Sequence, residues 1–154
     1  KAINSNKEFR MAYDENGNLG YFDKISPSYT IFHEDDKTFS DIWTEYDDNF
    51  YKFYNNVIDD MEKYKNVKGI KAKPNQPINT CPISSVPWLS FSGYSIDTPN
   101  FSPMLIPIIT MGKLFHINDD CFIPFSIYVN HAVADGFHLS RFFNEVQELI
   151  NSLS

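Results

Sequence analysis

The length of 154 residues fits one domain with a sizeable core. The formal net charge of −7 leaves no basic stripe for phosphates, which excludes nucleic acid as a partner. No stretch is long enough to span a bilayer and no signal peptide precedes the first predicted strand, so no membrane partner is expected.

The cysteine content indicates the redox compartment. Cys81 and Cys121 are isolated thiols, too few and too far apart for a disulfide framework, and no Cys/His cluster has zinc spacing. We therefore expect a cytoplasmic protein that binds no metal. The aromatic share of 16% could line a pocket for an aromatic substrate, or could simply reflect AT-rich coding.

The first predicted elements are a helical tail and a hairpin. Residues 1–6 are typical of the end of an interrupted helix, and the chain starts without Met, so we expect an N-terminal segment to be missing. The apolar runs Phe9–Tyr13 and Leu19–Phe22 flank an Asn-Gly pair, which is a strong hairpin signal.

Two strands and a helix are predicted next. Tyr29–Phe32 and Phe39–Trp43 read as short strands, and Asp47 or Asp48 is expected to cap a helix that ends near Tyr64. One face of this helix is apolar, and a second set of side chains should be turned to water. The apolar residues are Phe50, Phe53, Tyr54, Val57, Ile58, Met61 and Tyr64, and the solvated ones are Lys52, Asp59, Asp60 and Glu62.

The middle of the chain is predicted to be a loop followed by extended structure. Lys65–Pro82 is polar and contains three prolines, which favours a long surface loop. Ile83–Trp88 and Phe91–Ile96 should be extended. The apolar run Pro103–Met111 is typical of a buried strand.

The last elements complete the fold prediction. The buried run should pair with Phe122–Val129 across a turn at Asn118–Asp120, and a final helix should bury one face. That face carries Leu139, Phe142, Phe143, Val146, Leu149, Ile150 and Leu153. We predict an α/β (α+β) fold, a two-layer sandwich of helices on a mixed, largely antiparallel sheet.

A histidine motif precedes the last helix. His131 stands four residues before Asp135-Gly136, at the end of an apolar strand, where a tight turn can aim an imidazole at a ligand. Histidine is the side chain best suited to move protons near neutral pH. Asp135 could equally be the cap of the helix, and Gly136 should permit a positive φ or close packing.

The His-x-x-x-Asp-Gly pattern with Phe137 and His138 resembles the signature of the chloramphenicol acetyltransferase family. Two further segments resemble that family in the same order. They are Ser84–Trp88, with Ser-x-x-Pro-Trp, and Pro107–Lys113, which contains Thr110. Weaker likeness extends over almost the whole chain, so we expect a single family-like domain over residues 1–154, truncated at its N-terminus.

The resemblance implies a direct acetyl transfer from acetyl-CoA to the primary hydroxyl of chloramphenicol, with no bound cofactor. His131 would be the general base, Ser84 would donate to the oxyanion, and Thr110 would hold a water that also reaches it. Ser85 is the alternative if the register slips by one residue. Taken alone, Ser84 reads as a loop serine and Thr110 as a buried strand residue.

The resemblance also implies supporting residues and an assembly. Asp135, Gly136 and His138 would support the site. In the family the aspartate pairs with an arginine of the N-terminal part, which this chain does not show, and nothing in the sequence assigns that role to Arg10 or Arg141. Family members are homotrimers with sites between subunits. Phe39, Tyr94 and Trp88 are candidate substrate-binding aromatics, although ordinary packing explains each of them singly.

Other functions remain open from the sequence. Dihydrolipoyl acyltransferase cores and peptide-synthetase condensation domains share the His-x-x-x-Asp-Gly pattern, and a thiol acceptor such as dihydrolipoamide is therefore an alternative. An inactive or binding-only remnant of the same fold is a second alternative, because the expected arginine and N-terminal segment are not seen.

Overall fold

A computed structural model describes residues 1–95 and 104–153. The described chain forms two compact units. The first, here called the terminal unit, contains residues 1–25, 104–107 and 129–153. The second, here called the sheet unit, contains residues 26–95 and 108–128.

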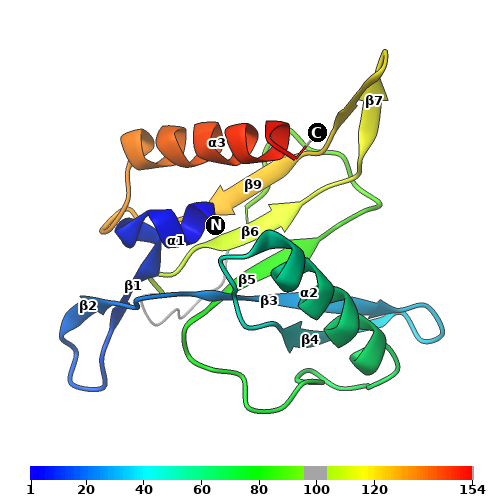
Figure 1. The fold of residues 1–154 in the computed structure, drawn as a ribbon, viewed down its shortest axis with the longest axis horizontal. Coiled ribbons are helices and arrows are strands. Elements are labelled where there is room, and N and C mark those ends of the chain that lie inside the picture. Colours follow the sequence, from blue (N-terminus) through cyan, green and yellow to red (C-terminus); the bar gives the residue numbers. More distant parts are fainter. Residues whose placement is uncertain (96–103, 154) are drawn as a thin grey trace. The chain divides into compact units, whose positions relative to one another are not determined.

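The terminal unit consists of short elements and one long helix (Figure 1). They are α1 (Ala2–Ser5), the 3-10 helix η1 (Lys7–Arg10), β1 (Met11–Tyr13), β2 (Leu19–Tyr21) and α3 (Gly136–Asn151). The strands β1 and β2 pair antiparallel, which confirms the predicted hairpin. Its first strand is shorter than predicted, because Phe9 and Arg10 belong to η1.

Phe9 and Phe142 form the centre of the terminal unit. Both side chains are fully buried, and their rings meet edge to face with centroids 5.3 Å apart. Edge-to-face pairs add to the stabilisation from burial. Of the apolar face predicted for α3, Phe142 alone is buried, and Phe143, Ile150 and Leu153 are exposed.

The sheet unit contains a five-stranded mixed sheet in the order β4-β3-β5-β6-β9 (Figure 1). The strand β3 pairs antiparallel with β4 and parallel with β5, while β6 pairs parallel with β5 and antiparallel with β9. The bounds are β3 (Ser26–His33), β4 (Thr38–Trp43), β5 (Thr80–Ser85), β6 (Ile108–Met111) and β9 (Phe125–Tyr128). The predicted mixed sheet is confirmed.

The helix α2 (Phe50–Tyr64) is capped by a residue other than those predicted. The Asn49 side chain accepts a hydrogen bond from the Lys52 backbone N–H at 3.0 Å. Asp47 instead accepts from the Asn49 N–H and pairs with the Lys52 ammonium. An asparagine caps as well as an aspartate, so composition alone could not select among three adjacent candidates.

The apolar face of α2 is divided between the sheet and solvent. Phe53, Val57 and Tyr64 are half-buried on the sheet side, where Tyr64 packs against a core cluster of Ile31, Ile42 and Ala72. The remaining apolar residues of the predicted stripe, Phe50, Tyr54, Ile58 and Met61, are exposed.

Several predicted boundaries in the middle of the chain were wrong. The strand β5 begins at Thr80, inside the predicted loop, and that loop also contains the buried Ala72. Residues 91–95 form no strand, and Ile96 lies outside the described residues. The run that starts at Pro103, itself outside the described residues, becomes a strand only from Ile108, after a proline that cannot donate to a ladder.

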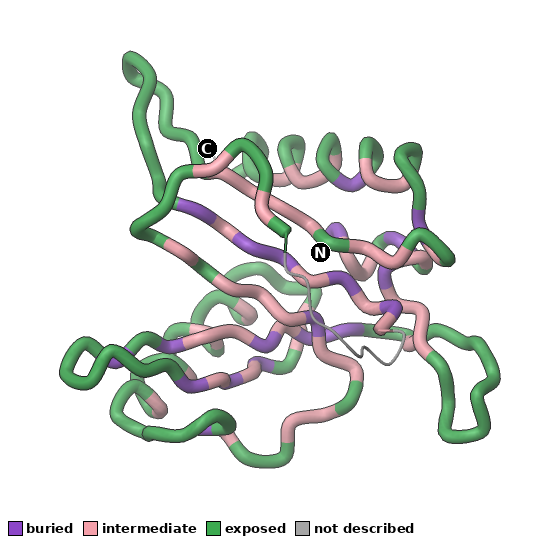
Figure 2. The backbone as a smooth tube through the Cα atoms, turned by 180° about the vertical axis from the view of Figure 1, so that it is seen from behind, coloured by how far each residue is buried: buried purple, intermediate pink, exposed green. Residues whose placement is uncertain are grey.

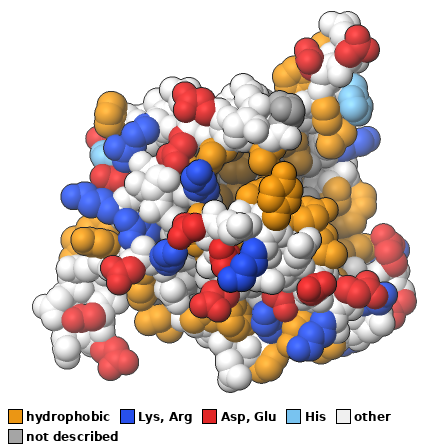
Figure 3. All heavy atoms as spheres, viewed as in Figure 1, with side chains coloured by type: hydrophobic (Ala, Val, Ile, Leu, Met, Phe, Trp, Pro, Cys, Tyr) orange, Lys and Arg blue, Asp and Glu red, His pale blue; other side chains and the backbone are white. Residues whose placement is uncertain are grey.

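A separate hairpin interrupts the predicted pairing of the late strands. Pairing of β6 with β9 is as expected, but β7 (Phe115–Ile117) and β8 (Asp120–Phe122) form their own two-stranded sheet between them. Asn118 takes the left-handed conformation in its turn. Figure 3 shows acidic side chains at the tip of this hairpin, above hydrophobic ones.

Burial is concentrated in the central strands, whereas the hairpin tips are exposed (Figure 2). Among the described residues, no helix combines the length and the apolar character needed to cross a bilayer.

The two thiols should react very differently. Cys81 is 3% exposed, and burial raises the pKa of its thiol to about 12, whereas Cys121 is exposed. Because the thiolate is the reactive form, we expect one rapid equivalent per native chain with a disulfide reagent and two after unfolding. In Cys121→Ser the rapid equivalent should vanish, and its persistence would contradict the burial of Cys81.

Candidate active site

Three hydroxyl side chains form a row across neighbouring strands of the sheet unit. Ser84 of β5 is the direct partner of Thr110 of β6, and Thr110 is the direct partner of Ser126 of β9. Directly paired residues project from the same face of a sheet, so the three hydroxyls share one face. Thr110 is buried and Ser84 is half-buried. The structure thus brings together two residues predicted from separate segments.

Ser126, the third member of the row, was missed in the sequence. Its Oγ donates a hydrogen bond to the Tyr94 carbonyl oxygen at 3.0 Å, and the Tyr94 ring lies 5.3 Å from that of Phe91. Ser126 therefore holds the Tyr94 segment beside the row. A serine in an alternating strand gives no local signal of this role.

Exposed aromatic side chains lie on the same face of the sheet. Tyr29 pairs with Ile83, so the next residue of each strand, Thr30 and Ser84, projects from the opposite face. Phe32, two residues beyond Thr30, shares that face.

The two predicted aromatics Phe39 and Trp88 are joined by Phe32. Phe39 is the strand partner of Phe32, and the Phe32 and Trp88 rings meet edge to face at 4.9 Å. Phe39 is 59% exposed and Trp88 is 64% exposed. We call Phe32, Phe39 and Trp88 the aromatic surface.

A cavity of about 280 Å³ lies between α2 and the sheet. Its lining is almost entirely apolar and comes from α2, β3, β5 and β6. The lining residues are Pro27, Tyr29, Thr30, Phe53, Val57, Ile83, Ser84, Ser85 and Met111. The strand β5 therefore borders the cavity and also carries Ser84, the first member of the hydroxyl row.

Gly112 allows the loop after β5 to approach the end of β6. A Cβ at this position would lie 2.8 Å from Phe91 Cε1 and 2.9 Å from the Leu89 carbonyl oxygen. That carbonyl accepts a hydrogen bond from the Lys113 N–H at 2.8 Å, so the loop cannot retreat without losing it.

We expect Gly112→Ala to destabilise the protein by about 1–3 kcal/mol, because the added methyl overpacks a backbone contact. Urea unfolding would measure the change. Gly93→Ala is the matched control, since a Cβ there meets no described heavy atom within 4 Å, and it should stay within about 0.5 kcal/mol. Equal effects of the two substitutions would contradict the tight approach at Gly112.

The loop that carries His131 belongs to the terminal unit and is shaped by Asn130. The Asn130 Oδ1 accepts a hydrogen bond from the Ala132 N–H at 3.0 Å. Its carbonyl oxygen accepts from the N–H groups of Val133 and Ala134 at 3.1 and 3.2 Å. These bonds turn the chain around His131, whose side chain is exposed.

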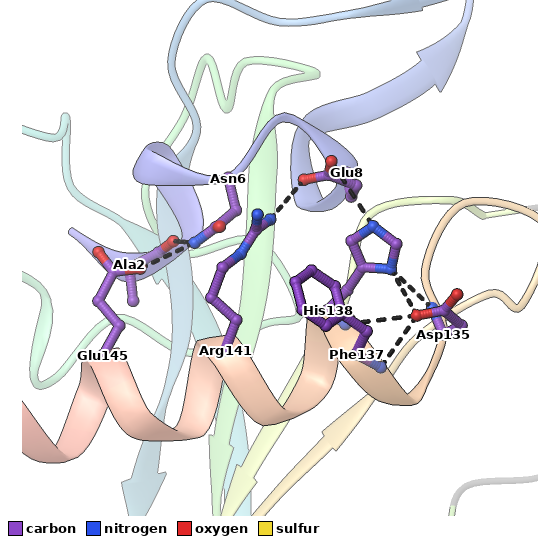
Figure 4. A network of polar contacts seen from close by, with 8 residues as sticks. All are labelled: Ala2, Asn6, Glu8, Asp135, Phe137, His138, Arg141 and Glu145. Carbon is purple, nitrogen blue, oxygen red and sulfur yellow. Dashed lines mark hydrogen bonds and ion pairs between the residues drawn. The ribbon is translucent and has the colours of Figure 1, made fainter.

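Asp135 is the N-cap of α3, as predicted (Figure 4). Its Oδ1 accepts from the Phe137 N–H at 3.0 Å and lies 2.7 Å from His138 Nδ1. The hydrogen bond with the His138 side chain is the largest cause that lowers the pKa of Asp135. Asp135 is thus held in a capping box with His138 as the second member.

His138 lies between two carboxylates in Figure 4. Its Nε2 is 3.7 Å from Glu8 Oε1, and Arg141 Nη2 donates to the other Glu8 oxygen at 3.0 Å. Burial alone would raise the pKa of Glu8, but a backbone hydrogen bond and the Arg141 charge hold it below its usual value. Arg10 donates instead to two backbone carbonyls, so both arginines are engaged away from Asp135.

The expectation for the Gly136 backbone was wrong. Gly136 is the first residue of α3 and has no positive φ, and a Cβ there would meet no described heavy atom within 4 Å. The turn before α3 is made by the Asn130 hydrogen bonds and the Asp135 cap, which need no special backbone at Gly136. Within residues 1–95 and 104–153, no group of three His, Cys, Asp or Glu side chains is placed to hold a metal.

Comparisons with known proteins point to one family. Residues 1–147 match a family model described as "Chloramphenicol acetyltransferase". The chloramphenicol acetyltransferase of Clostridium perfringens is 48% identical over 150 residues, which cover 97% of this chain and 68% of the relative. That of Clostridium butyricum is 50% identical over 147 residues, or 96% of this chain and 67% of the relative.

Solved structures agree on the fold. A chloramphenicol acetyltransferase superposes with a TM-score of 0.78 at 21% identity. The match covers 96% of this chain and 71% of the solved chain. The dihydrolipoamide acetyltransferase of Azotobacter vinelandii, studied for the role of a serine, a histidine and an asparagine in its mechanism, gives 0.64 at 16% identity. This second match covers 96% of this chain and 62% of the solved acetyltransferase chain. The predicted fold class is confirmed.

Proposed function

Because this chain belongs to the chloramphenicol acetyltransferase family of acyltransferases, we propose that it transfers an acetyl group from acetyl-CoA to the primary hydroxyl of chloramphenicol. The observation that carries the proposal is the direct pairing of Ser84 with Thr110 on adjacent strands. Two hydroxyls on one face of a sheet can provide a donor and an ordered water for one oxyanion.

The proposed reaction needs one base and no covalent enzyme intermediate. His131 removes the proton from the chloramphenicol hydroxyl as that oxygen attacks the thioester carbonyl. The carbonyl oxygen becomes an oxyanion, which accepts a hydrogen bond from Ser84 and from a water held by Thr110. The intermediate collapses with cleavage of the carbon–sulfur bond, and His131 returns the proton to the CoA sulfur.

We assign chloramphenicol to the face of the sheet that carries Ser84 and the aromatic surface. The aromatic surface, with Tyr94 nearby, suits the nitrophenyl ring of chloramphenicol, because aromatic rings stack favourably. Each aromatic side chain would contribute through contact area rather than chemistry.

Asp135 and His138 support the site in this proposal. Their mutual hydrogen bond and the cap of α3 hold the end of the loop that carries His131. We further propose a homotrimer in which His131 of one subunit acts with the binding residues of a neighbour, as the family resemblance implies. A cytoplasmic location follows from the same proposal.

Thiol release from acetyl-CoA tests the proposed function. We expect release that depends on chloramphenicol, and mass spectrometry should find a monoacetylated product. Dihydrolipoamide is the comparison acceptor, because dihydrolipoamide acetyltransferases share the fold. Thiol release with dihydrolipoamide but not with chloramphenicol would identify dihydrolipoamide as the acceptor. No thiol release with either acceptor would favour a binding-only protein.

A further inference from the structure

The loop after β5 is hydrogen-bonded to the neighbouring strands at two points. The Leu89 carbonyl oxygen accepts from the Lys113 N–H, just beyond the end of β6, at 2.8 Å. Further along, the Tyr94 carbonyl oxygen accepts from Ser126 Oγ of β9 at 3.0 Å. Residues 89–94, here called the crossing segment, therefore run from the end of β6 to β9.

Gly112 and Pro124 provide the surface on which the crossing segment packs. The Gly112 N–H donates to the Pro124 carbonyl oxygen at 2.8 Å, which continues the antiparallel ladder of β6 and β9 by one residue. Each lies two residues from a member of the hydroxyl row, Thr110 or Ser126, so all four face the same side of the sheet. A Cβ on Gly112 would meet Phe91 Cε1 at 2.8 Å and Pro124 Cβ at 3.0 Å. Phe91 therefore lies on the face that carries the hydroxyl row.

Tyr94 is held through both its backbone and its ring. Ser126 donates to the backbone oxygen, and the Phe91 ring, which packs on Gly112, lies 5.3 Å from the Tyr94 ring. The Ser126 hydroxyl has a single proton, and the bond to Tyr94 uses it. Ser126 is therefore committed to a neighbouring segment, although it is half-buried in the same row as two proposed catalytic hydroxyls.

The hydroxyl row has aromatic residues at both ends. Phe32 stands on β3 and Ser126, with Tyr94, on β9, while the strands that carry Ser84 and Thr110 lie between them. Neighbouring strands are about 4.8 Å apart, so β3 and β9 are separated by about 14 Å. The Tyr94 end of the crossing segment thus borders the row on the side opposite the aromatic surface.

We propose that Ser126 is a positioning residue, which holds Tyr94 at the β9 side of the acceptor site and so contributes to the affinity for chloramphenicol. The inference rests on the proposed function for the identity of the acceptor. Ser126 has no contact with the reacting atoms in this proposal, because its proton is directed to the Tyr94 carbonyl oxygen. Loss of this bond should weaken binding of the acceptor more than it slows acetyl transfer.

The first test compares Ser126→Ala with Ser126→Thr, which keeps a hydroxyl and suits a strand. We expect Ser126→Ala to raise the KM for chloramphenicol about five- to tenfold, with kcat and the KM for acetyl-CoA changed less than about twofold. Ser126→Thr should restore the wild-type KM. Ser152→Ala is the matched control, because it removes the same kind of bond, from a serine hydroxyl to the Leu149 carbonyl oxygen, at the exposed end of α3, and it should change nothing.

A double-mutant cycle shows whether Ser126 acts through Tyr94. Tyr94→Ala removes the ring that is positioned, so it should itself raise the KM for chloramphenicol. In that background, Ser126→Ala should add less than about twofold, because contacting residues that act together are not additive. Fully additive effects would mean that Ser126 acts on the acceptor by another route, and would overturn the proposal.

Cleavage by chymotrypsin after Tyr94 tests the hydrogen bond without any substrate. Proteolysis of a native chain follows the population of its locally opened state, so Ser126→Ala should be cut about five times faster at this site than the wild type or Ser126→Thr. Mass spectrometry would identify the site. Equal cleavage rates would show that the bond does not hold the segment.

The outcomes separate this inference from the proposed function. Chloramphenicol-dependent thiol release by the wild type, together with an unchanged KM in Ser126→Ala or an equal rise in both KM values, would overturn the role of Ser126 alone. Faster cleavage with an unchanged KM would overturn it too, because the bond would then hold Tyr94 without affecting the acceptor. A wild-type protein that neither acetylates nor binds chloramphenicol would overturn both the proposed function and this inference.

Discussion

The variant His131→Ala is expected to lose nearly all acetyl transfer, with kcat lower by about 10²- to 10⁴-fold, because His131 is the proposed general base for the hydroxyl proton. The His131 side chain is exposed, so its removal should leave the fold unchanged. Steady-state rates with both substrates would measure the loss of kcat. Circular dichroism and sedimentation would test whether the fold and the assembly state are unchanged.

His116→Ala is the control for this experiment, since His116 is an exposed histidine on the β7–β8 hairpin. Its turnover should equal that of the wild type. If His131→Ala keeps more than about a tenth of the wild-type kcat, another group is the base. If the variant also loses its assembly state, the histidine is structural, and the rate loss says nothing about proton transfer.

Ser84→Ala should slow the reaction while leaving substrate binding nearly intact. Removal of one oxyanion donor typically costs about 3–4 kcal/mol of transition-state stabilisation, which corresponds to a 10²- to 10³-fold lower kcat. Both KM values should change by less than about threefold, because the oxyanion exists only after attack on the carbonyl. Initial rates over a grid of both substrate concentrations would separate these constants.

Two neighbouring serines make this test sharper. Ser85→Ala addresses the alternative register, because Ser85 lies on the other face of β5, opposite Met111. Ser90→Ala, at an exposed position beyond the strand, should be neutral. A large loss of kcat in Ser85→Ala with normal turnover in Ser84→Ala would transfer the oxyanion role to Ser85. Weak binding with unchanged turnover in Ser84→Ala would reject that role altogether.

The motif around His131 shows what could be predicted from a single sequence. The turn, the cap at Asp135 and the helix that follows depend on residues within one or two helical turns of each other. Asn130 precedes His131 directly, but its part in the turn needed coordinates. The sequence could not reveal that its amide oxygen accepts from the Ala132 N–H.

Contacts between distant segments were beyond the reach of the sequence. Ser84 and Thr110 were each predicted by resemblance, but their direct pairing, and the addition of Ser126, depend on the register of three strands. A shift of one residue would have moved any of these hydroxyls to the other face. Nothing local to a strand determines which residue of its neighbour lies opposite.

By itself, the sequence determined the first hairpin, the two long helices, the mixed sheet and the family, because turn residues, hydrophobic periodicity and motifs are short-range properties. Tertiary structure alone decided which faces of α2 and α3 are buried, that Asp60 is held by Thr44 and Lys73, and that Asn49 caps α2. The physical reason is that burial and hydrogen-bond partners depend on chain segments brought together only by folding, whereas the sequence records each segment separately.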